Sequence, residues 1–354
     1  MSNPAHSTSG TKASGPYGVV AMAAYQPNLD LFRTQLESIQ KQTHANFDCL
    51  ISVDGDPEPI RSFVAEVLDD PRFHVLGFGD RLGFYGNFER VLSHVPAHAR
   101  WAALSDQDDY WYPEKLERLL PHLEEHQLVS GQARVVEAGS GRVIAASTSR
   151  RNVPFTDLIA QNQVTGGQTV FRRDLLDLAL PFPRLNTVTE VHDHWLAACA
   201  GAAGSVLVVD DIVQDYVQHG SNVLGEAAGG FNSFRSIRRA SALADRFEGG
   251  HSPAKVAAAC LNLSYGWRRI MVDTLFERLD SRSREFLKAH AVFSSGHRWV
   301  PTLSALAAGA RSGNIAPACL AEFAAGTPGE LLRTTFARRP GAPGFGRDRS
   351  PGKD

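Results

Sequence analysis

The chain has 354 residues and a formal net charge of −2, and 43% of its residues are hydrophobic and 21% charged. This composition is typical of a globular enzyme, and the length allows a core-bearing domain of about 200 residues and a smaller unit. No run of 18 apolar residues occurs and the first sixteen residues are small and polar, so we expect neither a membrane-spanning helix nor a secretory signal. Four cysteines lie far apart without a CxxC pair; this spacing argues against a disulfide framework or zinc knuckle and predicts a cytoplasmic protein.

The near-neutral net charge hides an asymmetry along the chain. Residues 1–225 contain 17 lysines and arginines against 27 aspartates and glutamates, whereas residues 226–354 contain 19 against 11. An acidic part suits a metal site, and a basic part suits an anionic surface or the acidic part itself. The two parts are therefore expected to contact different partners.

The first hundred residues alternate between apolar runs and segments with helical spacing. In chain order, the predicted elements are a strand at 17–24, a helix at 29–42, a strand at 47–53, a helix at 59–68, a strand at 73–78, a glycine-rich turn, a helix at 88–95 and a strand at 101–104. Such alternation predicts a mostly parallel sheet that binds its ligand at the carboxyl ends of the strands.

The remainder of the chain divides into a second stretch of mixed elements and a helical region. A charged helix is predicted at 114–126, with strands at 132–137, 142–146 and 205–209, and the spacing from 226 onward is helical. We therefore predict a disordered tail at 1–16, an α/β domain at 17–225, a helical region at 226–336 and a disordered basic tail at 337–354.

Polar residues follow several predicted strands, and the densest group is LSDQDDYW. Asp106 and Asp108 are two apart on an extended segment and point to the same side, while Asp109 turns away. Carboxylates this close repel one another unless a cation lies among them. A hard ion such as Mg²⁺ or Mn²⁺ fills its other positions with water and phosphate oxygens, so the segment predicts a phosphate-bearing substrate.

Other candidate residues each have an ordinary structural alternative. Tyr25 follows the first strand in a turn-forming AAYQPN segment, and Asp54 follows the second, where it either accepts a nucleobase imide N–H or forms an Asx-turn with Gly55. Asp193 is either a helix N-cap or a general base. His219 is either structural or a ligand in a polar, glycine-flanked loop.

Several well-known motifs are excluded. There is no GxxxxGK[ST] segment and no GxGxxG after the first strand. His122 and His126 have helical spacing, but no glutamate directly follows the first of them, so a solvated helix face is favoured over a zinc-protease site.

Seven segments, taken together and in order, carry a resemblance: AAYQPN, SVDGD, GDRLGFYGNF, LSDQDDYWYPEKL, VTGGQTVFRR, VHDHWLA and YVQHGSNVLG. Over residues 17–225 the chain resembles the family-2 inverting glycosyltransferases of GT-A fold, particularly their rhamnosyltransferase-like branch. The resemblance implies a Rossmann-like, mixed and mostly parallel sheet flanked by helices, with a helical C-terminal extension. It also implies a nucleotide-binding half at 17–112 and an acceptor half at 113–225.

The resemblance further implies roles for individual residues. Asp193 corresponds to the catalytic base. Asp106 and Asp108 correspond to the DxD pair, which binds the metal ion, Mg²⁺ or Mn²⁺, and His219 to a histidine that approaches the metal. The implied donor-binding residues are Ala24, Tyr25, Asp54, Arg81, Asp106, Gly166 and Gly167.

Two residues depart from the family pattern. Arg81 replaces an asparagine common in the NxG turn, and an arginine there can reach a phosphate. His192 precedes Asp193 where many members have glutamate, which puts the orientation of the base in question.

The implied reaction is inverting transfer of a sugar from a nucleoside diphosphate to an acceptor hydroxyl, in bacterial polysaccharide or glycoconjugate synthesis. The favoured donor is dTDP-rhamnose and the second is a UDP-hexose; the acceptor is a glycan, a lipid-linked molecule or a small molecule, and no nucleic acid is expected.

Two other functions remain open. A sugar nucleotidyltransferase is disfavoured because AAYQPN lacks the Gly-rich activating loop, and a catalytically inactive carbohydrate-binding scaffold is disfavoured by Asp106, Asp108 and Asp193 together. In the basic region, Phe231, Phe234, Arg235, Arg238 and Arg239 either form a face for peripheral membrane contact at the inner leaflet or belong to helices that cover the catalytic domain.

Overall fold

The computed structural model describes residues 15–185, 190–219, 244–245, 249–250, 252–294 and 299–336. The chain forms two compact units. The first comprises Met1–Asn152, Gln163–Phe182 and His192–Ala228, and the second comprises Val153–Asn162, Pro183–Val191 and Gly229–Asp354. The predicted membrane-facing residues between 231 and 239 lie outside the described residues.

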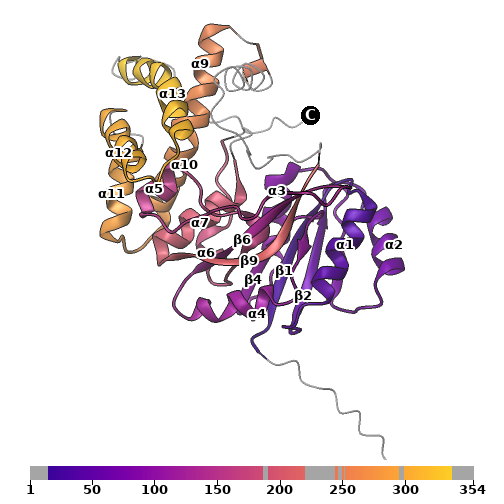
Figure 1. Cartoon of the computed structure of the whole chain (residues 1–354). Helices are drawn as coiled ribbons and strands as arrows, with labels where there is room; N and C mark the ends of the chain where they lie inside the picture. Colours follow the sequence, from indigo (N-terminus) through magenta and orange to yellow (C-terminus); the bar gives the residue numbers. More distant parts are fainter. Residues whose placement is uncertain are drawn as a thin grey trace, which may run out of the picture. The chain divides into compact units, whose positions relative to one another are not determined.

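Within the described residues, the first unit is built on one nine-stranded sheet with the order β3-β2-β1-β4-β8-β6-β9-β5, and β7 pairs with β6 (Figure 1). Strands β3, β2, β1 and β4 are mutually parallel, whereas β8 is antiparallel to both β4 and β6. The strands are β1 (Gly18–Ala24), β2 (Phe47–Val53), β3 (Phe73–Leu76), β4 (Trp101–Ser105), β5 (Tyr110–Trp111), β6 (Leu128–Glu137), β7 (Val143–Ala145), β8 (Thr169–Arg172) and β9 (Val206–Gln218).

Helices connect and cover the parallel strands. Asn28 caps α1 (Leu29–Gln40) by accepting the N–H groups of Asp30 and Leu31, as a residue of this type does at a helix start. The apolar faces of α1 and α2 (Glu58–Val67) pack on one side of the sheet. Helix α3 (Gly83–Ser93) contacts β1 and β2 on the other side of the sheet. There the hydroxyl of Ser52 donates to the side chain of Asn87 and accepts from that of Arg90.

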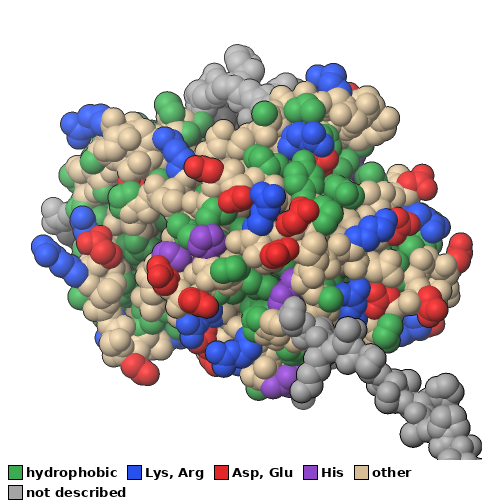
Figure 2. All heavy atoms as spheres, turned by 60° about the horizontal axis from the view of Figure 1, so that its bottom comes forward, with side chains coloured by type: hydrophobic (Ala, Val, Ile, Leu, Met, Phe, Trp, Pro, Cys, Tyr) green, Lys and Arg blue, Asp and Glu red, His purple; other side chains and the backbone are tan. Residues whose placement is uncertain are grey.

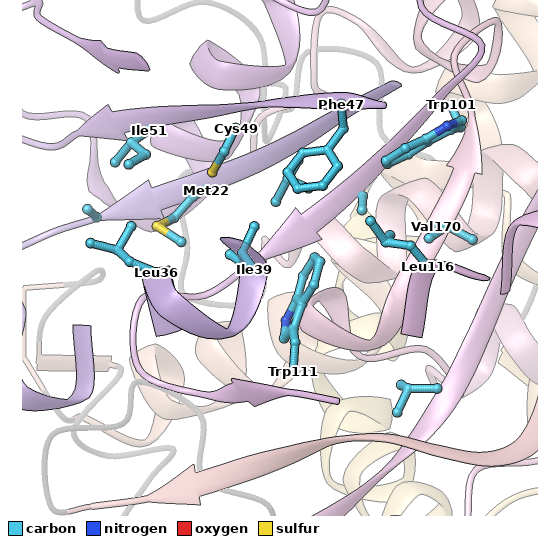
Figure 3. Packing of buried hydrophobic residues seen from close by; sticks show 14 of the residues in the cluster. Met22, Leu36, Ile39, Phe47, Cys49, Ile51, Trp101, Trp111, Leu116 and Val170 are labelled. Atoms are coloured by element: carbon cyan, nitrogen blue, oxygen red, sulfur yellow. The ribbon is translucent and has the colours of Figure 1, made fainter. Parts of the chain in front are cut away.

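The main hydrophobic core lies between the sheet and α1, α2 and α4 (Lys115–Leu119). Alternate residues of β1, β2 and β4 point into it, and Trp111 closes it on the side of β5 (Figure 3). Figure 3 shows Phe47 and Cys49 along β2 and Trp101 on β4; the ring centres of Phe47 and Trp101 are 6.5 Å apart although β1 lies between the two strands. Since β1 is GVVAMAA, almost wholly buried, the apolar run that predicted a strand also explains why it lies in the middle of the parallel half.

Some predicted boundaries differ from the observed ones. Helix α3 begins at Gly83, five residues before the predicted start, so part of the glycine-rich turn is helical. The predicted helix at 114–126 is a short α4 (Lys115–Leu119) followed by a 3-10 helix (Leu120–Glu124), because Pro121 lacks the N–H that a continuing helix requires. Strand β9 runs nine residues past its predicted end at Val209, through the sequence DDIVQDYVQ, in which polar and apolar residues come in pairs and do not show the period-two pattern of a strand.

Short helices complete the first unit: a 3-10 turn at Gly166–Gln168, α6 (Leu175–Ala179) and α7 (His192–Ala203). The second unit is helical where described. Its helices are α5 (Phe155–Ala160), α9 (Pro253–Leu261), a π-helical turn at Asn262–Gly266, α10 (Trp267–Arg278), α11 (Arg284–Phe293), α12 (Trp299–Arg311) and α13 (Pro317–Phe336).

Buried aromatic and charged side chains hold the second unit together. Trp267, Phe286 and Phe323 are almost completely buried. Arg268 donates two hydrogen bonds to the carbonyl of Ala160, at 2.9 and 3.1 Å, which ties α10 to the end of α5. The segment 153–162 thus belongs to the helical unit, although its sequence lies inside the predicted α/β domain.

Two further observations concern the surface. Within the described residues, no helix is both long and apolar enough to cross a membrane. On the face seen in Figure 2, acidic and basic side chains of the described residues are interspersed.

The close contact between Gly18 and Trp101 gives a prediction for stability. A Cβ atom on Gly18 would lie 2.1 Å from the Trp101 ring, so Gly18→Ala is expected to lower the free energy of unfolding by about 1–3 kcal/mol. Gly139→Asn is the control, because Gly139 has φ +79° and open space around it, and asparagine tolerates that conformation. Urea denaturation that finds equal stability for both variants would contradict the packing described here.

Candidate active site

Three polar side chains lie at one edge of the parallel sheet. Tyr25, Asp54 and Asp106 each follow the last residue of a strand, β1, β2 and β4 respectively. The register pairs Ala24 with Val53 and Met22 with Ser105, so the three strands end close together. The sequence predicted this clustering, since the carboxyl ends of neighbouring parallel strands meet at the same edge.

In the acidic segment after β4, Asp109 differs from Asp106 and Asp108 in its exposure. Asp109 turns inward and is 1% exposed; its carboxylate accepts the N–H of Val217 at 3.0 Å and the side-chain amide of Gln214 at 2.8 Å. Asp106 and Asp108 are partly exposed. His219 Nε2 lies 2.7 Å from Asp108 Oδ2, so the far end of β9 brings this histidine to the acids.

Burial and mutual repulsion raise the proton affinity of these acids. Burial, followed by the charges of Asp108 and Asp193, raises the pKa of Asp106 to about 7. Burial and the charges of Asp106 and Asp108 also raise the pKa of Asp109. The site is therefore a region of concentrated negative potential that a proton or a metal cation relieves.

The segment Gly166–Gly167 links these acids to Asp193. The N–H of Gly166 donates to Asp193 Oδ2 at 3.1 Å. A Cβ atom on Gly167 would lie 3.3 Å from Asp106 Oδ2 and 3.2 Å from Asp109 Oδ2. Close approach of backbone to the acids thus favours glycine here, and Asp193 is the second residue of α7 rather than its N-cap.

His192, beside Asp193, is buried against aromatic rings. Its ring stacks on Phe88 with 3.8 Å between ring centres and meets Phe84 edge-on. Burial lowers the pKa of His192 to about 3, so the imidazole is neutral at physiological pH. The residue that departs from the family pattern therefore packs against α3, while Asp193 keeps its bond to Gly166.

The end of β1, between Asp54 and Asp106, carries an aromatic and cationic pair. Gln107 bonds both the backbone N–H of Tyr25, at 2.7 Å, and its carbonyl, at 3.1 Å, which fixes the residue that follows β1. The guanidinium of Arg81 lies 4.1 Å from the centre of the Tyr25 ring. Both side chains are exposed to solvent and present a flat surface beside the strand ends.

Asp54 is more deeply placed than the sequence predicted. Its side chain is 3% exposed, and its two oxygens accept the backbone N–H groups of Leu82, at 2.6 Å, and Gly83, at 3.0 Å. Asp54 therefore does not form the local Asx-turn with Gly55 that was its structural alternative. The backbone of Ala24 is also engaged, since its carbonyl accepts the N–H of Asp54 at 2.8 Å.

Sequence reasoning missed two residues beneath the acids, Lys115 and Gln214. Both are fully buried, and Lys115 Nζ donates to the carbonyl of Gly167 and to Gln214 Oε1. In the sequence, Lys115 belongs to a charged segment that predicts a solvated helix. Its place two residues after the aromatic run YWYP was the only available sign of burial.

The described residues hold no ready-made three-ligand metal site. Nowhere in that part of the chain do three His, Cys, Asp or Glu side chains group closely enough to hold an ion by themselves. The predicted ligands Asp106, Asp108 and His219 thus do not form such a cluster. Two carboxylates whose charges repel each other nevertheless match what Mg²⁺ or Mn²⁺ requires when substrate phosphate supplies further oxygens.

Comparison with known proteins agrees with this architecture. Residues 19–177 match the family model for glycosyl transferase family 2. The predicted GT-A fold, a mixed and mostly parallel sheet with flanking helices plus a helical C-terminal region, is confirmed. The rhamnosyltransferase-like branch remains a prediction.

No curated protein matches the chain. Among solved structures, TarS 1–349 of S. aureus in complex with UDP-GlcNAc is 15% identical with a TM-score of 0.48, covering 91% of this chain and 92% of that one. Mannosyltransferase PcManGT from Pyrobaculum calidifontis, in complex with GDP-Man and Mn²⁺, is 17% identical with a TM-score of 0.46, covering 89% and 87%.

The raised pKa of Asp106 predicts a pH-dependent effect of its removal. The folded protein holds this proton up to about pH 7, against an ordinary value of 3.8, so the contribution of Asp106 to stability falls as pH rises between these values. Without added metal, Asp106→Asn is therefore expected to raise the melting temperature at pH 8 by at least about 2 °C.

The same substitution should have little effect at pH 5, where Asp106 is already protonated. Asp211→Asn is the control, because Asp211 forms an exposed pair with Arg118 that contributes little to stability. Thermal unfolding that shows Asp106→Asn to be destabilising at pH 8 would contradict the repulsion described here.

Proposed function

We propose that the first unit is a metal-dependent inverting glycosyltransferase, which moves a sugar from a nucleoside diphosphate to an acceptor hydroxyl. The observation that carries this proposal is that the Gly166–Gly167 backbone connects Asp106 to the carboxylate of Asp193, while the charge of Asp108 also acts on Asp106. A cation site and a candidate base on one short stretch of backbone are what transfer from a diphosphate leaving group requires.

Asp106 and Asp108 would hold Mg²⁺ or Mn²⁺, with His219 as a further ligand. Burial and the charges of Asp108 and Asp193, which raise the pKa of Asp106, support a cation here. The contact between His219 and Asp108 supports His219 as a further ligand. When bound, the metal would take up negative charge on the departing diphosphate.

The donor nucleotide would bind beside Tyr25 at this edge of the sheet. The exposed Tyr25 ring beside Arg81 suits stacking on a base and charge pairing with a phosphate. Each oxygen of Asp54 accepts one backbone N–H and keeps a second lone pair, which suits the imide N–H of thymine or uracil. We favour dTDP-rhamnose as donor and a UDP-hexose as the alternative.

Asp193 would act as the general base. Its carboxylate would take the proton of the acceptor hydroxyl as that oxygen attacks the anomeric carbon from the side opposite the diphosphate, which inverts the configuration. The N–H of Gly166 would orient this carboxylate toward the acceptor hydroxyl.

We further propose a role in polysaccharide or glycoconjugate synthesis, with a glycan, lipid-linked or small-molecule acceptor. All four cysteines are free thiols, in keeping with the expected cytoplasmic location. Peripheral contact with the inner membrane surface stays a prediction, because its residues at 231–239 lie outside the described residues.

Substitution of the two kinds of acid should separate chemistry from binding. Asp193→Asn is expected to lower turnover at least about 100-fold, the contribution of a general base, while UDP or dTDP with Mn²⁺ still raises the melting temperature. Asp108→Asn should abolish both turnover and the metal-linked shift. Nucleotide release from dTDP-rhamnose and UDP-hexoses, together with thermal shift, measures these effects.

Asp211→Asn serves as the matched control and should behave as wild type. Unchanged turnover in Asp193→Asn would refute the base assignment. Metal-linked nucleotide binding by a wild type that turns over no donor would favour the inactive carbohydrate-binding scaffold instead.

A further inference from the structure

A buried lysine lies beneath the acids. Lys115, the first residue of α4, is completely buried. Its Nζ donates to the carbonyl of Gly167 and to Gln214 Oε1, the latter at 2.9 Å, and lies 3.3 Å from the centre of the Trp111 ring. An ammonium group has three N–H donors and no acceptor. Two oxygens and one aromatic face therefore match its three donors.

Gln214 connects this ammonium group to the acids. Its Oε1 accepts from Lys115 and its Nε2 donates to Asp109 Oδ2 at 2.8 Å, so the amide has a partner on each side. The other carboxylate oxygen of Asp109 accepts the N–H of Val217. Lys115, Gln214 and Asp109 thus form one continuous buried network that joins α4, β9 and the segment after β4.

The same ammonium group fixes the backbone that contacts Asp193. Lys115 bonds the carbonyl of Gly167, and the N–H of the preceding residue, Gly166, donates to Asp193. Gly167 lies against Asp106 and Asp109, and Gly166 lies against His192, so that an added Cβ atom would be crowded at either glycine. A displacement of the Gly167 carbonyl would therefore move the hydrogen-bond donor of Asp193 relative to the acids.

We propose that Lys115 is a positioning residue for sugar transfer, which fixes the Gly166–Gly167 backbone and, through Gln214, Asp109, so that Asp193 and the acids keep a productive separation. This inference rests on the proposed function and deepens it. The lysine acts entirely through other residues and contacts no substrate. Its loss should consequently impair the chemical step more than donor binding, because Tyr25 and Arg81 are held by other elements.

The test compares Lys115→Met with Lys41→Met in the full chain. Methionine has a similar length but no charge and no donor, and Lys41 pairs with Glu37 on the exposed side of α1. Using whichever donor the wild type turns over, we expect Lys115→Met to lower kcat about 10- to 100-fold, the effect of a small misplacement of reacting groups. KM for the donor should change less than about threefold, and Lys41→Met should match wild type.

Gln214→Met provides a second, independent variant, which tests the positioning role of the network if Lys115→Met does not fold. It breaks the link to Asp109 and should also lower kcat with little change in KM. If both residues act as one network, the double variant should be no more than about threefold slower than the slower single variant. Wild-type kcat in a folded Lys115→Met or Gln214→Met protein, or a change confined to KM, would overturn the inference.

The outcome for the wild type separates this inference from the proposed function. If the wild type releases no nucleotide from any donor with Mn²⁺, the proposed function fails and the inference falls with it. If the wild type is active, Asp108→Asn is inactive and Lys115→Met is fully active, the proposed function stands and only the role of Lys115 is refuted.

Discussion

Electrostatic repulsion among the carboxylates that follow β4 is the constraint on which the candidate site depends. Asp106 and Asp109 carry raised pKa values because burial and neighbouring acids disfavour their charges. The fold counters this repulsion from below with the buried Lys115, whose own pKa burial lowers while Asp109 and Asp106 oppose that shift. From the solvent side, only a proton or a cation can relieve it. The acid cluster is therefore suited to bind a divalent ion together with an anionic substrate.

The sheet explains why these groups meet. Parallel strands β1, β2 and β4 end at one edge and place Tyr25, Asp54 and Asp106 there, while β8 and β9 approach from the other half of the sheet. The extension of β9 to Gln218 supplies Gln214 to the buried network and His219 to Asp108. A single rigid sheet thus fixes both the proposed nucleotide end and the proposed catalytic end of the site.

The sequence was informative where local patterns decide structure. Apolar runs and their polar ends predicted the parallel strands and the residues at their carboxyl ends, and the period-two spacing predicted that Asp109 turns away from its neighbours. Long-range contacts were not predictable in this way. The burial of Lys115 depends on Gly167 and Gln214, which are distant in sequence, and the engagement of Asp54 depends on a loop that follows β3. The α4 region was predicted too long because apolar spacing continues across Pro121, although the proline ends the α-helix.

The central claim is that Asp106 and Asp108 form the cation site of a nucleoside diphosphate-binding enzyme. Anomalous X-ray scattering from crystals grown with Mn²⁺ and either dTDP or UDP tests it most directly. The account predicts one manganese peak bonded to Asp108, next to Asp106 and in contact with the diphosphate, with the base near Tyr25. A nucleotide bound at this edge without manganese, or manganese bound away from both aspartates, would contradict it.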